Sequence, residues 1–210
     1  MTTTPPDTLA DCYPQHQPMF LRPILRRLDQ FAPYAHSVLD AGCGDGNFVE
    51  SLQKERGYEV FGIDASRSGI EIASARNIGR FEQSSLYSSL TDPFGVKSFD
   101  VIVSVEVIEH LYAPSDFIRQ TEAALEPGGI LILTTPYWGY VKNLALAVTN
   151  RVDQKLTALW EGGHIKHWSR KTLTQLVLER KFEVLSFDGS DGLRPPYLWS
   201  AFVMAFRRIA

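Results

Sequence analysis

Cysteine, an excess of positive charge and long apolar runs are all scarce in this sequence of 210 residues. It contains two cysteines, Cys12 and Cys43, so it indicates neither a disulfide framework nor a cysteine-rich zinc site. The formal net charge of −3 lacks the basic excess that a general nucleic-acid-binding surface requires, and we expect no nucleic-acid partner. No run of about 20 uncharged apolar residues occurs, so no segment is expected to span a membrane.

The amino-terminal segment also lacks the features of a secretory signal. It has neither a basic start nor an apolar centre, and we therefore expect a cytoplasmic protein with reduced thiols. Apolar residues make up 44% of the chain and charged residues 21%, which is ordinary for a soluble globular protein. The length predicts one domain over residues 1–210, with residues 1–15 loosely ordered.

Short apolar runs alternate with amphipathic helical patterns over most of the chain. The expected strands cover residues 37–42, 58–64, 79–83, 99–105 and 128–135. The expected helices cover residues 19–31, 46–56, 66–75 and 114–125. Strands that alternate with helices in this way favour right-handed crossovers and a parallel sheet.

Two strand-like runs without a helix between them end the chain. They cover residues 181–189 and 197–208, and the short connection between them favours an antiparallel pair. We therefore predict an α/β fold with a Rossmann-like, doubly wound, seven-stranded sheet. This sheet is expected to be mostly parallel, with an antiparallel C-terminal strand.

The strongest local motif is VLDAGCGDGNF at residues 38–48. A strand ends in Asp40, and three glycines at alternate positions then lead into a helix. Glycine lets the backbone turn tightly and approach a ligand closely, and the start of a helix presents free N–H groups. The next strand ends in Asp64, whose carboxylate is suited to accept hydrogen bonds from the ribose hydroxyls of a nucleoside.

Three interpretations of this glycine turn are open from the residues. A dinucleotide site uses Gly-x-Gly-x-x-Gly and binds a pyrophosphate at the helix start, but here Asp40 precedes the first glycine and would repel that anion. S-adenosylmethionine carries an ammonium, a sulfonium and a ribose, which match the acids Asp40 and Asp64. The third interpretation is a turn with a structural role alone. The charge pattern favours S-adenosylmethionine.

The chain resembles the class I S-adenosylmethionine-dependent methyltransferases. The motifs VLDAGCGDG, GID and LEPGGILILTTP carry the similarity, which covers residues 35–136, and the antiparallel finish agrees with that fold. The resemblance implies S-adenosyl-L-methionine as cofactor and S-adenosyl-L-homocysteine as product. The cofactor-binding residues that it implies are Asp40, Gly42, Cys43, Gly44, Asp45, Asp64, Ala65, Ser85, Leu86 and Val105.

The resemblance also implies how these residues divide the cofactor between them. Asp40 and the first two glycines of the turn are expected at its methionine end, and Asp64 at its ribose. The family often has an acid after its third strand, near the adenine amino group. This chain reads QSSLYSS there, with Ser85 and Leu86 in place of the acid. Cys43 suits the turn as a small residue, with no reactive role implied.

A second motif, SVEVIEHLY at residues 104–112, places Glu106, Glu109 and His110 directly behind the fourth strand. Their spacing of i, i+3 and i+4 predicts that they share one face of a helix. Together with WEGGHIKHWS at residues 160–169, this motif is similar to the ubiquinone-biosynthesis O-methyltransferases and their relatives. That subgroup methylates phenolic hydroxyls of polyprenylated rings. The resemblance implies a site beside the transferred methyl group and a cluster able to hold a divalent cation.

Chemistry gives an independent reason for such a cluster. A phenol with a pKa of about 10 is only about 0.1% ionised at pH 7, and ionising it costs roughly 4 kcal/mol. A positioned base or a metal ion offsets that cost. We therefore predict Glu106, Glu109, His110 and His164 as catalytic residues. The first three are also the predicted ligands if Mg²⁺ or Mn²⁺ is bound.

Structural alternatives to these roles are also open. In this alternative, Glu106 and Glu109 are solvated acids near the start of a helix, where negative charge is favourable. His110 is then a partly buried histidine that is hydrogen-bonded to the backbone. His164 and His167 stand in a loop with two glycines, which either closes over a pocket or carries simple surface charge.

Residues 140–160 keep apolar residues at helical spacing and carry Lys142, Arg151 and Lys155. The favoured interpretation is a helix that covers an apolar substrate as a lid, within an insertion at residues 140–168. A helix lying on a membrane surface is an alternative that would make the protein membrane-associated. Ordinary core packing is the remaining one.

The sequence therefore predicts an enzyme that transfers the methyl group of S-adenosylmethionine to a hydroxyl of a small aromatic or apolar molecule. One alternative is N- or C-methylation of another small metabolite, since an unprotonated amine needs no base. Another is a catalytically silent nucleotide-binding partner subunit. The complete glycine turn and the charged cluster argue against that last alternative.

Overall fold

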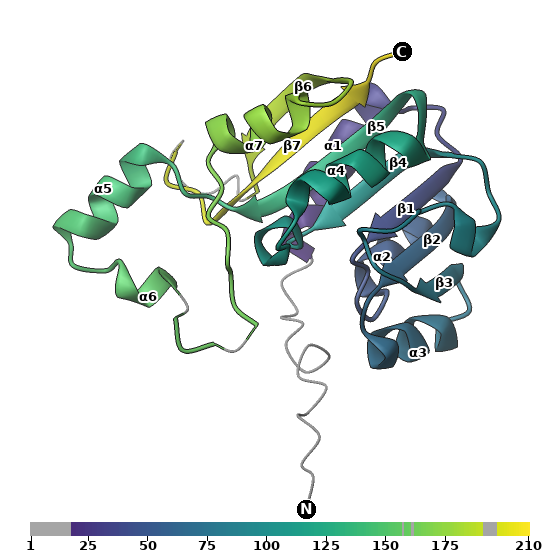
Figure 1. Ribbon diagram of the computed structural model, residues 1–210, viewed down its shortest axis with the longest axis horizontal. Helices are drawn as coiled ribbons and strands as arrows, with labels where there is room; N and C mark the ends of the chain where they lie inside the picture. The colour runs from purple at the N-terminus through teal and green to yellow at the C-terminus, as the bar shows by residue number, and fades with distance from the viewer. Residues whose placement is uncertain (1–17, 157, 161, 191–196) are drawn as a thin grey trace, which may run out of the picture.

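The computed structural model describes residues 18–156, 158–160, 162–190 and 197–210, and Figure 1 shows their arrangement. The prediction that residues 1–15 are loose therefore lies outside the described residues. Among the described residues, seven strands form one sheet in the order β3-β2-β1-β4-β5-β7-β6. They are β1 (Ser37–Ala41), β2 (Glu59–Asp64), β3 (Arg80–Gln83), β4 (Phe99–Val105), β5 (Leu125–Pro136), β6 (Phe182–Gly189) and β7 (Ala201–Arg208).

The first five strands are parallel, whereas β7 runs antiparallel to both of its neighbours, β5 and β6. The predicted fold class is thus confirmed, with the antiparallel strand inserted between β5 and β6 rather than at the edge. Residues 190–200 connect the last two strands, and these 11 residues are slightly fewer than the dozen or more that a parallel crossover needs.

Helices cover both faces of this sheet (Figure 1). The helices of the described residues are α1 (Pro18–Phe31), α2 (Asn47–Arg56), α3 (Arg67–Ala75), α4 (Pro114–Ala124), α5 (Tyr140–Val148), α6 (Asp153–Leu156) and α7 (Arg170–Leu178), of which α5 and α6 lie away from the sheet. Within the described ranges, the short 3₁₀ turns η2 (Asp92–Phe94) and η3 (Ile108–His110) lie between strands. The expected helices before residue 126 agree with α1 to α4 within one or two residues.

Alternate residues of the central strands form two separate apolar layers. Leu39 and Ile102 belong to the layer that packs against α4 and α7. Val38 and Val101 face the other way and pack against α1 and α2. Because successive side chains of a strand point to opposite faces, a sheet covered on both sides needs mainly apolar residues on both faces of its strands. This is why the central strands read as continuous apolar runs.

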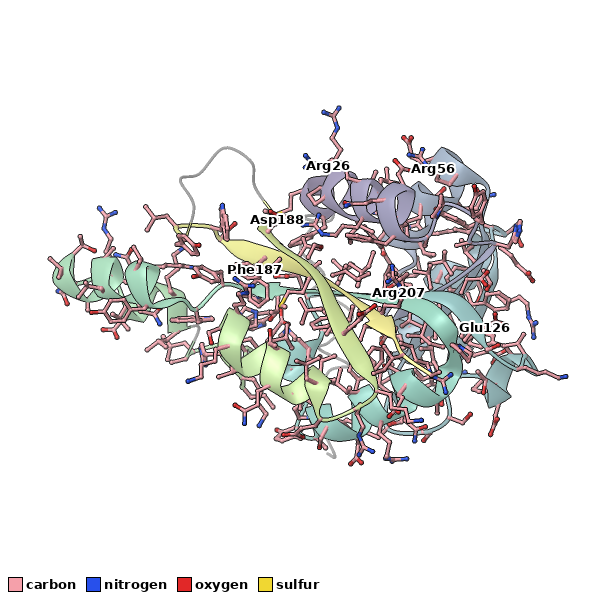
Figure 2. All side chains as sticks on the ribbon, turned by 90° about the horizontal axis from the view of Figure 1, so that it is seen from above. Arg26, Arg56, Glu126, Phe187, Asp188 and Arg207 are labelled. Atoms are coloured by element: carbon pink, nitrogen blue, oxygen red, sulfur yellow. The ribbon has the colours of Figure 1, made fainter. Side chains whose placement is uncertain are left out.

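The outer strand β6 is connected to α1 by a buried arginine. Arg27 donates to the Asp188 carboxylate at 2.6 Å and to the Ser186 hydroxyl at 3.1 Å. Figure 2 labels Asp188 at the end of β6, next to α1. On the same strand, Glu183 accepts a hydrogen bond from Arg207 of β7 at 2.9 Å. These contacts fix the antiparallel end of the sheet to the rest of the domain.

The segment 140–160 differs from the single helix that its periodicity predicts. The chain forms α5, turns at Asn150, whose φ of +53° is left-handed, and starts the one-turn helix α6 at Asp153. Asparagine tolerates the left-handed region better than most residues, which explains the break at this position. No residue of α5 or α6 is buried, and both helices project from the sheet (Figure 1). The interpretation of this segment as part of the hydrophobic core is therefore wrong.

In the described part of the chain, none of the helices combines the length and the apolar character needed to cross a bilayer. The position of the site follows from the strand order instead. The chain order reverses between β1 and β4, and ligands of open α/β sheets bind beyond the carboxyl ends of the strands at such a point. The glycine turn after β1 and the acidic motif after β4 both lie there.

Candidate active site

The glycine turn after β1 needs glycine for two reasons. Gly42, Gly44 and Gly46 have φ values of +89°, +53° and +76°, in the region that residues with a Cβ rarely adopt. In addition, a Cβ on Gly42 would lie 2.5 Å from a methyl carbon of Val107. The turn therefore lies directly against the segment that follows β4, which places the two sequence motifs side by side.

Asp64 connects the glycine turn to the start of α3. One oxygen of its buried carboxylate accepts a hydrogen bond from the Gly44 N–H at 2.9 Å, and the other accepts from the Ser66 N–H at 2.8 Å. The next residue, Ala65, is exposed, and its carbonyl accepts from the Gln83 side chain at 3.0 Å. A carboxylate at the end of β2 is thus held in place with both oxygens at the edge of the sheet.

Asp40 is a buried acid with an unsatisfied oxygen. Its side chain is 2% exposed, and its Oδ1 has no hydrogen-bond partner among the described residues. Burial, followed by the charges of Asp64 and Asp45, raises the pKa of Asp40 to about 8. A buried carboxyl that is left unpaired is costly, and a bound cation beside it would reduce that cost.

The remaining predicted cofactor residues lie at the same edge. Ser85 and Leu86 follow β3, and the Ser84 N–H donates to the Asp64 carbonyl at 3.0 Å, which holds this segment beside the end of β2. Ser85 is exposed, whereas Leu86 is buried, as is Val105 at the end of β4. This edge of the sheet therefore carries an exposed serine and two buried apolar side chains.

The segment after β4 does not form the helix on which Glu106, Glu109 and His110 were predicted to share a face. Glu106 has a left-handed φ of +57° and lies outside the 3₁₀ turn η3. Its N–H donates to the Thr134 hydroxyl at 3.0 Å, and that hydroxyl donates to the Glu106 carboxylate at 2.9 Å. Glu106 is held by the Thr134 side chain of β5, and the spacing of the acids in the sequence does not show this partner. Burial raises the pKa of Glu106 to about 7.

Glu109 is the most deeply buried acid of the cluster, at 1% exposure. Its Oε2 accepts from the Thr135 hydroxyl at 2.9 Å, whereas its Oε1 has no hydrogen-bond partner among the described residues. Burial, together with the charge of Glu106, raises the pKa of Glu109 well above its usual range. The Glu109 carbonyl also accepts from the Ile165 and Lys166 N–H groups, so this residue holds the loop before α7.

Two histidines complete the cluster. His110 Nδ1 lies 2.9 Å from the Gly162 carbonyl oxygen, which accepts only, so Nδ1 carries the proton and Nε2 keeps its lone pair. Burial lowers the pKa of His110. The ring of His164 lies 5.0 Å from that of His110, and burial followed by the charges of His110 and His167 lowers the pKa of His164 to about 4. Both imidazoles are therefore neutral at pH 7.

The described residues with metal-binding atoms that converge here are Glu109, His110 and His164, whose ligand atoms lie within 4.8 Å of one another. His164 Nε2 is 4.0 Å from the Glu109 carboxylate. This group differs from the predicted set, because it takes His164 in place of Glu106. His167 packs against Trp138 at 4.3 Å between ring centroids and is not in this group.

Sequence reasoning missed Trp160 and the two threonines of β5. The Trp160 ring lies 5.8 Å from that of His110 and 5.6 Å from that of His164. No periodicity marks this tryptophan, because it lies in an irregular loop. Thr134 and Thr135 are fully buried. Because buried hydroxyls need hydrogen-bond partners, two threonines at the end of an apolar strand were a signal of polar groups nearby.

Comparison with known proteins comes from sequence and from structure. The family model described as "Methyltransferase domain" matches residues 13–186. A ubiquinone biosynthesis O-methyltransferase of Vibrio parahaemolyticus is 30% identical over 134 residues, which are 61% of this chain and 56% of that protein. The chain thus spans about half the length of this curated relative.

Two solved structures share the fold. One is a Haloferax volcanii methyltransferase in complex with the Trm112 methyltransferase activator, with a TM-score of 0.74 and 15% identity over 97% of this chain and 96% of that chain. The other is magnesium protoporphyrin IX methyltransferase from Synechocystis with bound SAH, with a TM-score of 0.67 and 17% identity over 92% and 83%. At these identities the two structures establish the fold alone.

Proposed function

Because the chain belongs to the methyltransferase domain family, we propose that it transfers the methyl group of S-adenosylmethionine to a hydroxyl oxygen of a small aromatic or apolar molecule. The observation that carries this proposal is the contact between the glycine turn and the segment after β4, where Gly42 meets Val107. This contact supports an arrangement in which the acids that suit a cationic nucleoside lie near a cluster that suits a hydroxyl nucleophile. The relative that is named an O-methyltransferase supports oxygen as the acceptor.

In this proposal the acids bind the charged and polar ends of the cofactor. Asp40 faces the ammonium of the methionine moiety, and Asp64 accepts hydrogen bonds from the ribose hydroxyls. Ser85 and Leu86 contact the adenine ring, and Gly42 and Gly44 allow the backbone to approach the cofactor. The unpaired Oδ1 of Asp40 supports this assignment, because a cation is the partner that a buried carboxylate lacks.

The Asp40 assignment predicts that cofactor affinity depends on pH. Without ligand, the Asp40 pKa of about 8 keeps the carboxyl protonated at lower pH, whereas the cation favours the ionised form. Affinity for S-adenosylhomocysteine should therefore rise by up to about tenfold per pH unit from pH 6 to pH 8 and then level off. Calorimetry at four pH values measures this slope. An Asp40→Asn variant should lose the slope, and a parent protein with constant affinity from pH 6 to pH 8 would refute the assignment.

The chemistry at the acceptor requires loss of a proton from the hydroxyl. In methyl transfer the oxygen attacks the methyl carbon in line with the breaking carbon–sulfur bond, so alignment is a main part of catalysis. His110 Nε2 is unprotonated and is free to take that proton as general base. Its Nδ1–H bond to Gly162 orients the ring and sets the tautomer. A negative charge on Glu109, whose ligand atom lies within 4.8 Å of that of His110, would stabilise the charge that develops on the imidazole.

A divalent cation is a second way for the same residues to activate the hydroxyl. Glu109, His110 and His164 fit such an ion, because both imidazoles are neutral and one Glu109 oxygen has no hydrogen-bond partner among the described residues. Two nitrogens and one oxygen suit Mn²⁺ better than Mg²⁺, which prefers oxygen ligands. When bound, the cation would lower the pKa of the acceptor hydroxyl. The Thr135 hydroxyl orients the Glu109 carboxylate in either case.

A direct test combines cofactor binding with product analysis. The protein should bind S-adenosylhomocysteine in calorimetry, and it should convert simple catechols and quinols to products in which one hydroxyl carries a methyl group, as mass spectrometry would show. Tight binding of NADH with no response to S-adenosylhomocysteine would overturn the proposal. If the protein methylates amines but no phenol, the methyltransferase assignment stands and the proposal of a hydroxyl acceptor is wrong.

The projecting segment 140–160 supplies a cover for the acceptor in this proposal. Several of its apolar side chains are exposed, among them Val141, Leu144 and Leu159. An open cavity of about 530 Å³ lies along α6 and residues 158–160, and Trp160 lines both this cavity and the histidine cluster. An apolar acceptor that fills the cavity would bring its hydroxyl to His110. We therefore favour a lid over a membrane-surface helix.

Deletion of residues 141–159 tests the lid. Loss of about 60–100 Å² of apolar contact corresponds to about 1.5–2.5 kcal/mol, so the acceptor KM should rise by roughly 10- to 70-fold. Affinity for S-adenosylhomocysteine should change less than about twofold, because the glycine turn lies elsewhere. Steady-state kinetics and calorimetry separate the two effects. If the parent sediments with liposomes and the deletion abolishes this, the membrane interpretation replaces the lid.

A further inference from the structure

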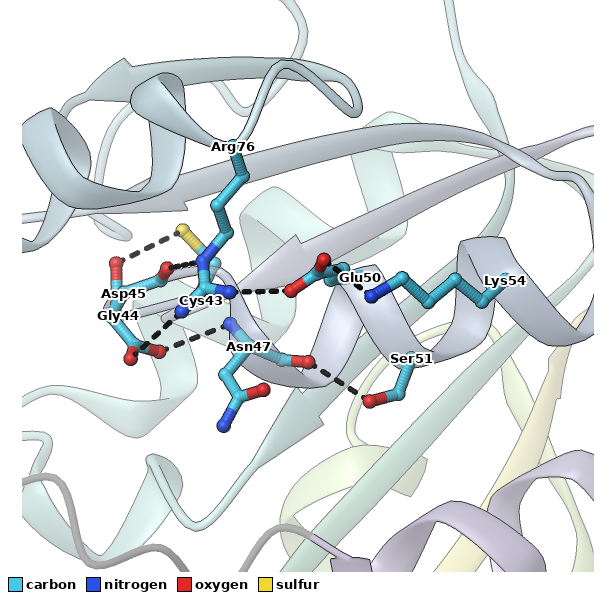
Figure 3. Close-up of polar contacts among 8 residues, drawn as sticks. All are labelled: Cys43, Gly44, Asp45, Asn47, Glu50, Ser51, Lys54 and Arg76. Atoms are coloured by element: carbon cyan, nitrogen blue, oxygen red, sulfur yellow. Dashed lines mark hydrogen bonds and ion pairs between the residues drawn. The ribbon is translucent and has the colours of Figure 1, made fainter.

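Arg76 makes a set of contacts that connects the end of α3 with the glycine turn (Figure 3). Its Nε donates to the Asp45 carbonyl at 2.7 Å, and one Nη donates to the Asp45 carboxylate at 3.3 Å. The other Nη donates to the Glu50 carboxylate in the first turn of α2, and Lys54 donates to the same carboxylate at 2.6 Å. All three guanidinium nitrogens are therefore used on the turn and on the helix that follows it.

These contacts complete a closed path through the site. At one end, Asp64 connects the Gly44 N–H to the Ser66 N–H at the start of α3. From there α3 runs to its final residue, Ala75, and Arg76 returns to Asp45. The path is tight, because a Cβ on Gly69 in α3 would lie 2.9 Å from the Gly44 carbonyl oxygen. The glycine turn is thus held from both ends of one helix.

The turn needs such support because of its composition. Three glycines with left-handed φ values surround Asp45, and glycine loses more conformational freedom on ordering than any other residue. A turn without side-chain contacts would sample many conformations, and a ligand would have to select the right one at a cost in affinity. Asp45 is the residue between the second and third glycines, and its backbone and side chain both contact Arg76.

The guanidinium also balances local negative charge. Asp45 lies near the buried Asp40, and the charges of Asp45 and Asp64 both act on Asp40. The Arg76, Asp45 and Glu50 side chains are 26%, 31% and 19% exposed, so these pairs are less screened than ordinary surface ion pairs. Arginine suits this place because its planar fork binds a carbonyl and two carboxylates at once.

We infer that Arg76 is a positioning residue that holds the glycine turn in its cofactor-binding conformation. This inference rests on the proposed use of S-adenosylmethionine. Arg76 acts through Asp45 and the start of α2, without a role in the chemical step. It therefore determines how strongly the cofactor binds rather than how fast a bound cofactor reacts.

The test compares three variants with the parent by calorimetry with S-adenosylhomocysteine and by kinetics. Arg76→Met should weaken binding by about tenfold, the lower part of the range for a charged hydrogen bond because the site is partly exposed, while kcat at saturating cofactor changes less than twofold. Arg76→Lys should recover part of the affinity. Arg67→Met, which removes a solvent-exposed ion pair with Glu71 on the same helix, should match the parent.

Hydrogen exchange of the ligand-free protein supplies a second measurement that a global loss of stability would not reproduce. In Arg76→Met the amides of Gly44, Gly46 and Asn47 should exchange faster, whereas the amides of β4 and β5 should exchange as in the parent. Parental affinity and parental exchange in Arg76→Met would overturn the inference, as would a fall in kcat with unchanged affinity. A parent that binds no S-adenosylhomocysteine would instead refute the proposed function, and the exchange of the turn would still report on Arg76.

Discussion

Replacing His110 with alanine should lower the turnover number by about 10²- to 10⁴-fold, with affinity for S-adenosylhomocysteine almost unchanged. The structure gives the reason for both parts. His110 Nε2 is the unprotonated nitrogen of an oriented ring, so its loss removes the proton acceptor. Most of the proposed cofactor residues lie in the glycine turn and at the ends of β2 and β3, on segments other than the one that carries His110.

The pH dependence of this loss distinguishes a missing base from a damaged fold. As the pH rises toward about 10, the pKa of an ordinary phenol, more of the acceptor arrives already ionised. The deficit of His110→Ala should therefore shrink with increasing pH. A damaged fold would not recover activity in base. Steady-state kinetics of the parent and of His110→Ala from pH 6 to pH 10 measures this deficit.

His167→Ala is the matched control, because it removes an imidazole from the same loop. His167 packs against Trp138 and lies outside the group formed by Glu109, His110 and His164. Its turnover should stay within a few-fold of the parent. If His110→Ala has parental turnover at pH 7, the proposal that this cluster activates the acceptor is wrong.

A bound cation would add a further signature to the same experiment. Chelation of the parent should then reproduce the His110→Ala defect, and Mn²⁺ should restore activity. Glu109→Gln should mimic chelation, because it removes the charged oxygen donor but keeps the shape of the side chain. Calorimetric titration of the chelated parent with Mn²⁺ gives a measurement that is independent of turnover. An active parent that is indifferent to chelation would leave His110 as the base and exclude the cation.

Replacing Asp64 with alanine should weaken binding of S-adenosylhomocysteine by about 1.5–3 kcal/mol, or roughly 10- to 150-fold. The variant loses the acceptor for the ribose hydroxyls. It also leaves the Gly44 and Ser66 N–H groups without their present partner, so the turn and the start of α3 are less well held. Calorimetry measures the affinity, and thermal unfolding measures the accompanying loss of stability.

Asp100→Ala provides the matched control for Asp64. The Asp100 carboxylate accepts from the His36 and Ser37 N–H groups at 2.8 and 2.9 Å, so it too connects backbone amides. It lies at the amino end of β4, away from the glycine turn. Asp100→Ala should lose stability yet keep parental affinity for the cofactor. Parental affinity in Asp64→Ala would remove Asp64 from the ribose.

Local sequence determined the framework of this protein. Strands buried on both faces are mainly apolar on both, so the runs at residues 37–42 and 99–105 predict β1 and β4 closely. The glycine turn and the acid that ends β2 are equally visible, because backbone conformation and strand ends depend on neighbouring residues. The antiparallel finish followed from the length of a single connection. These features depend on interactions over a few residues, which the order of amino acids specifies directly.

The tertiary structure decided which side chains meet in the site. Helical spacing grouped Glu106 with Glu109 and His110, but Thr134 of β5 binds Glu106, and His164 joins the cluster instead. His110 is bonded to Gly162, which lies 52 positions further along the chain. Arg76 likewise reaches Asp45 across 31 positions. Contacts of this range arise only when the folded sheet brings distant loops to one edge, because no local periodicity records which polar groups will be buried together.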